Sequence, residues 1–216
     1  MINITELGDR LKEALNIELP GTEVQWEMAS SDRMAVSYPK IPNSNTRPGG
    51  VLILLYPADD KIKTLFIQRP VYDGVHSGQI AFPGGKMEES DLNITVTALR
   101  EACEETGICG DNVHVLGSLT PLFIHVSNIE VTAVVGYCHR RPDFMIQESE
   151  VVSLIEAELD HFAQAENIHE RPMQIRNESL NVKYYDYRGN IIWGATAMIL
   201  KELIEVIDRS GITLSG

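Results

Sequence analysis

Residues 76–108 read HSGQIAFPGGKMEESDLNITVTALREACEETGI, and the rest of the chain can be understood from this stretch. Its first part contains the run Phe82-Pro83-Gly84-Gly85, which is typical of a turn. Its second part predicts a helix. Ser90 is the expected cap, Asp91 places a negative charge at the positive end of the helix dipole, and Gly107 supplies the stop.

The predicted helix has two chemically different faces. An α-helix turns by about 100° per residue, so Glu104 and Glu105 lie within roughly 60° of Glu101. The opposite side carries the apolar residues Leu92, Val96, Leu99 and Cys103. We therefore expect the apolar side to be buried and the glutamates to form an exposed acidic face.

This acidic face has two interpretations. Like charges three and four residues apart each cost a few tenths of a kcal/mol in an isolated helix, and Arg100 is the one cation close to them in the sequence. A solvated acidic surface is one interpretation. A site for a divalent cation is the other, because hard cations prefer carboxylate oxygens. Helical geometry alone leaves both open.

Length and composition bound the class of protein. The chain has 216 residues, 44% of them hydrophobic, which is enough for a sizeable core, and we expect a single domain over residues 1–216. The net charge of −13 argues against binding to nucleic acid and means that an anionic substrate needs cations locally. No apolar run reaches membrane-spanning length, and the N-terminus resembles an amphipathic helix more than a signal peptide.

The cysteines lead to an expectation about compartment. There are three, an odd number, and none are in CxxC spacing. We therefore expect reduced thiols in a cytoplasmic protein and no zinc site.

The remaining pattern predicts an α/β fold in which helices cover both faces of a sheet. A helix is expected at 3–17 and another at 194–208, with a short one at 161–165. Residues 18–49 look like an irregular covering segment, or alternatively one that reaches a second subunit of a homodimer. Strands are expected at 51–56, 64–69, 80–82, 113–123, 130–139, 150–156, 173–176 and 182–187.

Gly85 together with Arg100-Glu101-Ala102-Cys103-Glu104-Glu105-Thr106-Gly107-Ile108 resembles the signature of the Nudix hydrolases, G-x5-E-x7-R-E-U-x-E-E-x-G-U, where U is aliphatic. One departure is the distance from Gly85 to Arg100, which is one residue longer than in the general pattern. Counted back from Arg100, Leu92 occupies the place of the first glutamate and Asp91 is one place off.

The same insertion is typical of one branch, the coenzyme A pyrophosphatases. Residues 76–85 resemble that branch's motif L-R-x-H-x-G-Q-[VI]-[AS]-F-P-G-G, although Asp73-Gly74 stands where the motif has Leu-Arg. Residues 192–197, Ile-Trp-Gly-Ala-Thr-Ala, resemble its I-W-G-x-T-A at the start of the last helix. The resemblance covers roughly residues 47–208.

The resemblance implies a Nudix fold, a mixed β-sheet sandwiched between α-helices. It also implies Mg²⁺- or Mn²⁺-dependent hydrolysis of coenzyme A to 3′,5′-ADP and 4′-phosphopantetheine. The metal ligands that it implies are Glu101, Glu104, Glu105 and the carbonyl of Gly85. Arg100 would orient the acids by pairing with Asp91 or with a ligand glutamate.

Other roles stay open at this point. The general base is Glu104 or Glu105, or a loop acid such as Glu148 or Glu150. Candidates for substrate contacts are Arg69, His76 and Gln79, and Trp193 either stacks on a base or packs in the core.

Two further functions are alternatives. One is a Nudix hydrolase acting on another dinucleotide, such as ADP-ribose or NADH. The other is a Nudix-fold nucleotide sensor without catalysis. The complete set of Arg100, Glu101, Glu104 and Glu105 argues against the sensor, which has no need of every metal carboxylate.

Overall fold

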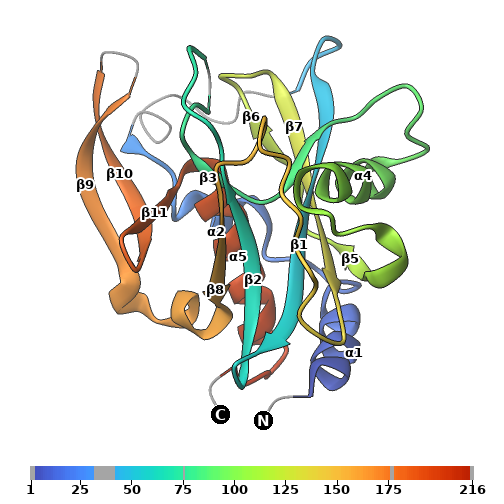
Figure 1. Ribbon diagram of the computed structural model, residues 1–216. Coiled ribbons are helices and arrows are strands. Elements are labelled where there is room, and N and C mark those ends of the chain that lie inside the picture. Colours follow the sequence, from blue (N-terminus) through green and yellow to red (C-terminus); the bar gives the residue numbers. More distant parts are fainter. Residues whose placement is uncertain (1–2, 32–41, 75, 176–177, 215–216) are drawn as a thin grey trace.

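The computed structural model describes residues 3–31, 42–74, 76–175 and 178–214. A mixed β-sheet with helices on both faces forms its body, and a smaller three-stranded sheet stands to one side (Figure 1). The predicted α/β class is confirmed. None of the described helices has the length and apolar character that crossing a bilayer requires.

The larger sheet is built around two long parallel neighbours, β1 (Arg47–Ala58) and β7 (Ile129–Tyr137). The hairpin from β1 to β2 (Lys61–Gln68) turns through Asp59 and Asp60, both with positive φ, as tight hairpin turns require. The remaining strands of this sheet are β3 (Ile80–Ala81), β4 (Gly84–Lys86), β5 (His114–Ser118), β6 (Leu122–Ile124) and β8 (Ser153–Glu158).

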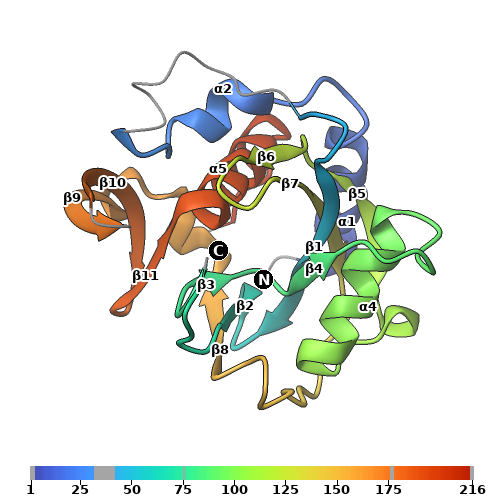
Figure 2. The same cartoon turned by 90° about the horizontal axis from the view of Figure 1, so that it is seen from above.

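Helices cover this sheet from both sides (Figure 2). On one face lie α1 (Ile4–Ala14), α2 (Gly21–Trp26) and α5 (Gly194–Arg209), and on the other lies α4 (Ile94–Thr106). Side chains along β1 alternate between the two cores, since Ile53 and Leu55 face α5 while Leu52 and Leu54 face α4.

The smaller sheet consists of β9 (Ile168–Ile175), β10 (Glu178–Tyr187) and β11 (Asn190–Trp193), all antiparallel. It lies on the side of the molecule opposite α4 (Figures 1 and 2). The predicted strand pair is confirmed in β9 and β10. The third strand was not predicted, and it leads directly into α5.

Several predicted elements differ in detail. The single strand expected at 113–123 is divided into β5 and β6, after a 3₁₀ turn at Gly110–Asn112. The segment 18–49 contains α2 and the start of β1, and its residues 32–41 lie outside the described residues. The short helix near 161 is a 3₁₀ helix, Leu159–Ala163, followed by another at Ala165–Asn167.

The orientation predicted for α4 is wrong. The residues that it buries against the sheet include Ala98 and Ala102, both fully buried. Leu92 lies before the helix and is 89% exposed, and Val96 and Leu99 are only partly buried. The apolar side of the predicted helix is therefore only partly buried, and Leu99 packs against the margin of the core.

Close packing explains this orientation. A Cβ atom on Gly50 of β1 would come within 2.7 Å of the Ile94 carbonyl oxygen and 3.0 Å of the Ala98 nitrogen. Helix and strand are so close that only small side chains fit between them. Burying the small residues turns Glu101 and Glu105 toward the sheet, because they share that side of the helix.

Candidate active site

The glycine pair predicted as a turn is instead part of a strand. Gly84 and Gly85 belong to β4 and pair with Val51 and Gly50 of β1. A Cβ atom on Gly84 would overlap the Gly50 carbonyl, and one on Gly85 would overlap the carboxyl group of Glu101. Glycine is therefore needed at both positions for the backbone to approach β1 and the helix glutamate so closely.

Glu105 is a buried carboxylate, with 1% of its surface exposed. Its Oε2 accepts a hydrogen bond from the Gly84 backbone N–H at 2.8 Å, and its Oε1 lies 3.8 Å from Arg69 Nη1. Burial raises the pKa of Glu105 to about 7, although the Gly84 bond and the Arg69 charge oppose the rise. Burial also raises the pKa of the half-buried Glu101.

Arg100 connects the acids, as the family resemblance implied, and it pairs with both Asp91 and the glutamates. Its Nε and Nη2 bond the two oxygens of Asp91 at 3.1 and 3.0 Å, and its Nη1 bonds Glu101 at 2.9 Å and Glu104 at 3.3 Å. These bonds hold the pKa of Asp91 well below its usual range. Arg100 thereby fixes the glutamates relative to the loop before the helix.

The predicted helix cap is wrong. The N-cap is Asn93, whose Oδ1 accepts from the Val96 N–H at 3.1 Å, and not Ser90. Asp91 lies before the helix and accepts from the Glu88 N–H and the Thr97 hydroxyl, so its charge anchors the loop. The predicted stop is confirmed, because Gly107 ends the helix in the left-handed conformation.

The predicted metal ligands do not form a preformed coordination site among the described residues. Glu101 and Glu105 face β4, whereas Glu104 is exposed at the rim. Within the described ranges, no three His, Cys, Asp or Glu side chains are close enough together to hold a metal ion. The donor chemistry nevertheless fits a hard cation. Glu105 is buried and Glu101 half-buried, and burial raises the pKa of both although Arg69 and Arg100 lie beside them. Carboxylate oxygens are hard ligands, and Mg²⁺ keeps several waters and needs few protein oxygens.

Glu150 also belongs to this acidic neighbourhood. Its charge makes a small contribution to the raised pKa values of both Glu101 and Glu105. Glu148, the other predicted loop acid, is not among the main causes of either rise in pKa.

A cavity of about 900 Å³, within the size range of ligand pockets, is lined by residues 76–80 and by the smaller sheet. The predicted substrate residues His76 and Gln79 line it, with His76 Nδ1 3.0 Å from Gln79 Oε1. Arg69 joins the cavity wall to the glutamates, because its backbone N–H donates to the Gln79 carbonyl at 3.0 Å. Its Nε is buried and has no hydrogen-bond partner among the residues that the structure describes. Trp193 also lines the cavity.

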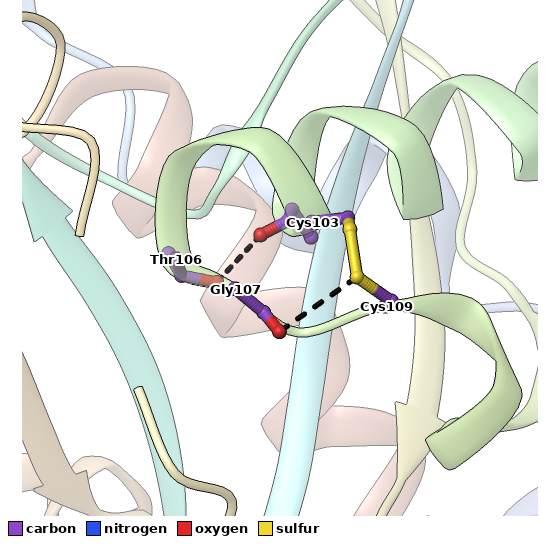
Figure 3. The surroundings of a disulfide bond; sticks show 5 residues. Cys103, Thr106, Gly107 and Cys109 are labelled. Atoms are coloured by element: carbon purple, nitrogen blue, oxygen red, sulfur yellow. Dashed lines mark hydrogen bonds between the residues drawn. A yellow bond between two sulfur atoms is a disulfide. The ribbon is translucent and has the colours of Figure 1, made fainter. Parts of the chain in front are cut away.

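Cys103 and Cys109 form a disulfide, so the expectation of reduced thiols is wrong for this pair (Figure 3). Gly107 reverses the chain at the end of α4 and brings the two Cα atoms to 4.4 Å. Two cysteines on either side of a helix-terminating glycine are the sequence signal that would have indicated it. Cys138 is buried and free.

Comparison with known proteins identifies the family. A family model described as the NUDIX domain matches residues 46–174. The uncharacterized Nudix hydrolase NudL of Yersinia pestis (strain Pestoides F) is 34% identical over 211 residues, covering 93% of this chain and 96% of that protein. The NudL of Pectobacterium atrosepticum is 38% identical over 135 residues, covering 62% and 70%. The chain belongs to the Nudix family and is a pyrophosphohydrolase.

Solved structures agree on the fold. The Nudix hydrolase RenU of M. smegmatis superposes with a TM-score of 0.51 at 14% identity, over 76% of this chain and 87% of that one. A MutT/nudix family protein from Enterococcus faecalis has a TM-score of 0.51 at 16% identity, over 87% and 73%. The predicted Nudix fold is confirmed. The family generally uses divalent metals and binds nucleotide substrates.

Proposed function

We propose that the protein hydrolyses the diphosphate bond of coenzyme A or its derivatives, releasing 3′,5′-ADP and the 4′-phosphopantetheine half. One observation carries this proposal. The two stretches that resemble the coenzyme A branch, 76–85 and 192–197, are far apart in sequence but line one cavity through His76, Gln79 and Trp193. They are also bonded directly, since the Thr196 hydroxyl donates to the Ile80 carbonyl at 3.1 Å.

In this proposal Glu101, Glu104, Glu105 and the Gly85 carbonyl hold Mg²⁺ or Mn²⁺. The ion supplies positive charge against the diphosphate and lowers the pKa of a bound water. Arg100 keeps Glu101 and Glu104 in place. Arg69, whose Nε has no protein partner, binds a phosphate oxygen beside Glu105.

We assign the general base to Glu150. Two observations support this choice: the side chain is exposed, and its negative charge contributes to the raised pKa values of Glu101 and Glu105. In this proposal it takes the proton from an attacking water. Glu150→Gln should lower kcat about 10²–10⁴-fold. Glu148→Gln, two residues away and also exposed, is the matched control and should retain activity. Equal losses in the two variants would remove this assignment.

Product analysis tests the proposed substrate. Purified protein with Mg²⁺ should convert coenzyme A to 3′,5′-ADP and 4′-phosphopantetheine, identified by chromatography and mass spectrometry. ADP-ribose and NADH serve as competing substrates in the same assay. A strong preference for either of them would overturn the coenzyme A assignment and leave the protein a Nudix hydrolase of another dinucleotide.

A variant of Glu104 tests the metal assignment. Glu104→Gln should abolish turnover and leave the melting temperature unchanged, because the side chain is exposed and only its charge is removed. Glu89→Gln is the matched control, since Glu89 is an exposed acid in the preceding loop. Full activity in Glu104→Gln would show that this carboxylate holds no metal.

A further inference from the structure

We propose that Arg171 is a specificity-determining residue that binds an anionic group of the substrate outside the scissile diphosphate. Arg171 lies on β9 and lines the same cavity as His76, Gln79 and Trp193. This inference deepens the proposed function and depends on it for the placement of the substrate in this cavity.

The charge of the cavity wall is the first observation. The chain has 31 acidic residues and a net charge of −13. Even so, the described residues that line the cavity include no aspartate or glutamate. Arg171 is the one lysine or arginine among them, and His76 and His125 are the other groups that can carry positive charge. The absence of carboxylates among these described residues spares a bound anion the repulsion that the rest of the surface would exert.

The setting of Arg171 is the second observation. The guanidinium carbon lies 5.0 Å above the ring of Tyr184 on the neighbouring strand, a contact that holds the planar group in place. Two other arginines form ion pairs. Arg141 Nη2 lies 2.7 Å from a carboxylate oxygen of Glu156, and Arg188 Nη2 lies 2.9 Å from one of Glu158. Across the described ranges Arg171 has no such ion pair. Its charge-assisted donors are thus available to a ligand.

The apolar side of the same wall orients the ligand. Met173 follows Arg171 on the same face of β9, and Leu180, Ile191 and Trp193 line the cavity from β10 and β11. A flat or apolar portion of the substrate can rest against these side chains while Arg171 binds the anion. Two groups of coenzyme A substrates have this chemistry: the 3′-phosphate of the nucleotide, and a terminal carboxylate on a diacid acyl chain.

Two substrate pairs separate these sources. Coenzyme A and 3′-dephospho-coenzyme A differ by the phosphate, and glutaryl- and valeryl-coenzyme A differ by a carboxylate in place of a methyl group. Arg171→Gln should lower kcat/KM for the anionic member of one pair about 10- to 100-fold and change its neutral partner by less than about twofold. Arg171→Lys should lose less, because it keeps the charge without the planar fork.

Arg188→Gln is the matched control. Arg188 also stacks over a tyrosine ring of the small sheet, at 5.2 Å, but does not line the cavity, so both substrate preferences should stay as in the wild type. The substrate pair whose preference changes in Arg171→Gln shows whether the phosphate or the carboxylate is the bound group. Unchanged preferences in Arg171→Gln, or equal losses for both members of each pair, would overturn the inference.

The assays give a different result if the proposed coenzyme A hydrolysis itself is wrong. In that case the wild type itself would not hydrolyse coenzyme A substrates, whatever residue stands at 171. The same comparison is then made with NADPH and NADH, which differ by a 2′-phosphate. A preference for NADPH that Arg171→Gln abolishes would support the role of Arg171, and a preference unaffected by that change would overturn it.

Discussion

Glu105 occupies a place where a folded protein normally has an apolar side chain. It is 1% exposed and lies beneath β4, with one backbone hydrogen bond from Gly84 and a distant arginine. A carboxylate in such a place costs stability when it ionises. A cation bound beside Glu105 would offset this cost, as the proposed function requires.

The pKa of Glu105 leads to a prediction about stability. Its folded value of about 7 lies above the ordinary 4.5, so the folded state holds the proton more tightly. The free energy of unfolding should therefore fall as pH rises from about 4.5 to about 7, by about 3 kcal/mol from this group. Denaturant unfolding across this pH range, with EDTA to keep the protein free of metal, measures this change in the free energy of unfolding.

Glu105→Gln should lack this part of the pH dependence, because the amide does not titrate. Its stability relative to the wild type should therefore be higher at about pH 8 than at about pH 5. Glu104→Gln is the control, since that side chain is exposed and should follow the wild type. Parallel curves for the wild type and Glu105→Gln would show that the buried carboxylate carries no such penalty.

At the scale of elements, the contact between α4 and β1 decides which side chains reach the site. Ala98 is fully buried over Gly50, whereas Leu99 is partly exposed on the outer side. Ala98→Leu should lower the free energy of unfolding by about 1–3 kcal/mol or more through overpacking. Leu99→Ala should cost less than the roughly 2–5 kcal/mol of a fully buried leucine.

Urea unfolding of the two variants gives the comparison directly. Ala98→Leu should also lower activity, because a displaced helix moves Glu101 and Glu105 away from β4. If Leu99→Ala proved the more destabilising of the two, the outer side of α4 would have to be the buried one, contrary to the structure.

The disulfide after α4 predicts a thiol count and a loss of stability. Without reductant, the denatured protein should show one reactive thiol, Cys138, and with reductant three. Cys109→Ser should lower the free energy of unfolding by about 2 kcal/mol, the expectation for a short closed loop. Reduced wild type should match the variant. Three thiols without reductant would contradict the pairing.

At the scale of the whole molecule, the two sheets contribute different functional residues. The larger sheet and α4 bring the glutamates, Arg100 and Arg69 together. The smaller sheet, β9 to β11, contributes Arg171 and Trp193 to the cavity wall. The family match ends at residue 174, so β10 and β11 lie beyond it. The part of the chain outside the shared domain thus shapes the cavity.

The sequence predicted the features that depend on near neighbours along the chain. The β1–β2 hairpin, the stripe of α5 and the stop at Gly107 are confirmed. Each is set by local backbone preferences or by helical spacing. The signature also placed the chain in its family, because many specified residues coincide at fixed distances.

Only the tertiary structure decided which side of α4 is buried and which distant residues share the cavity. The apolar pattern of α4 favours the wrong side, because it says nothing of how closely Gly50 lets the helix approach. Arg171 has no local signal at all, since its role depends on a sheet formed about 70 residues after Glu101 in the sequence. Features that depend on neighbours along the chain follow from residue spacing. Close packing and cavity walls depend on contacts between distant segments, which form only when the chain folds.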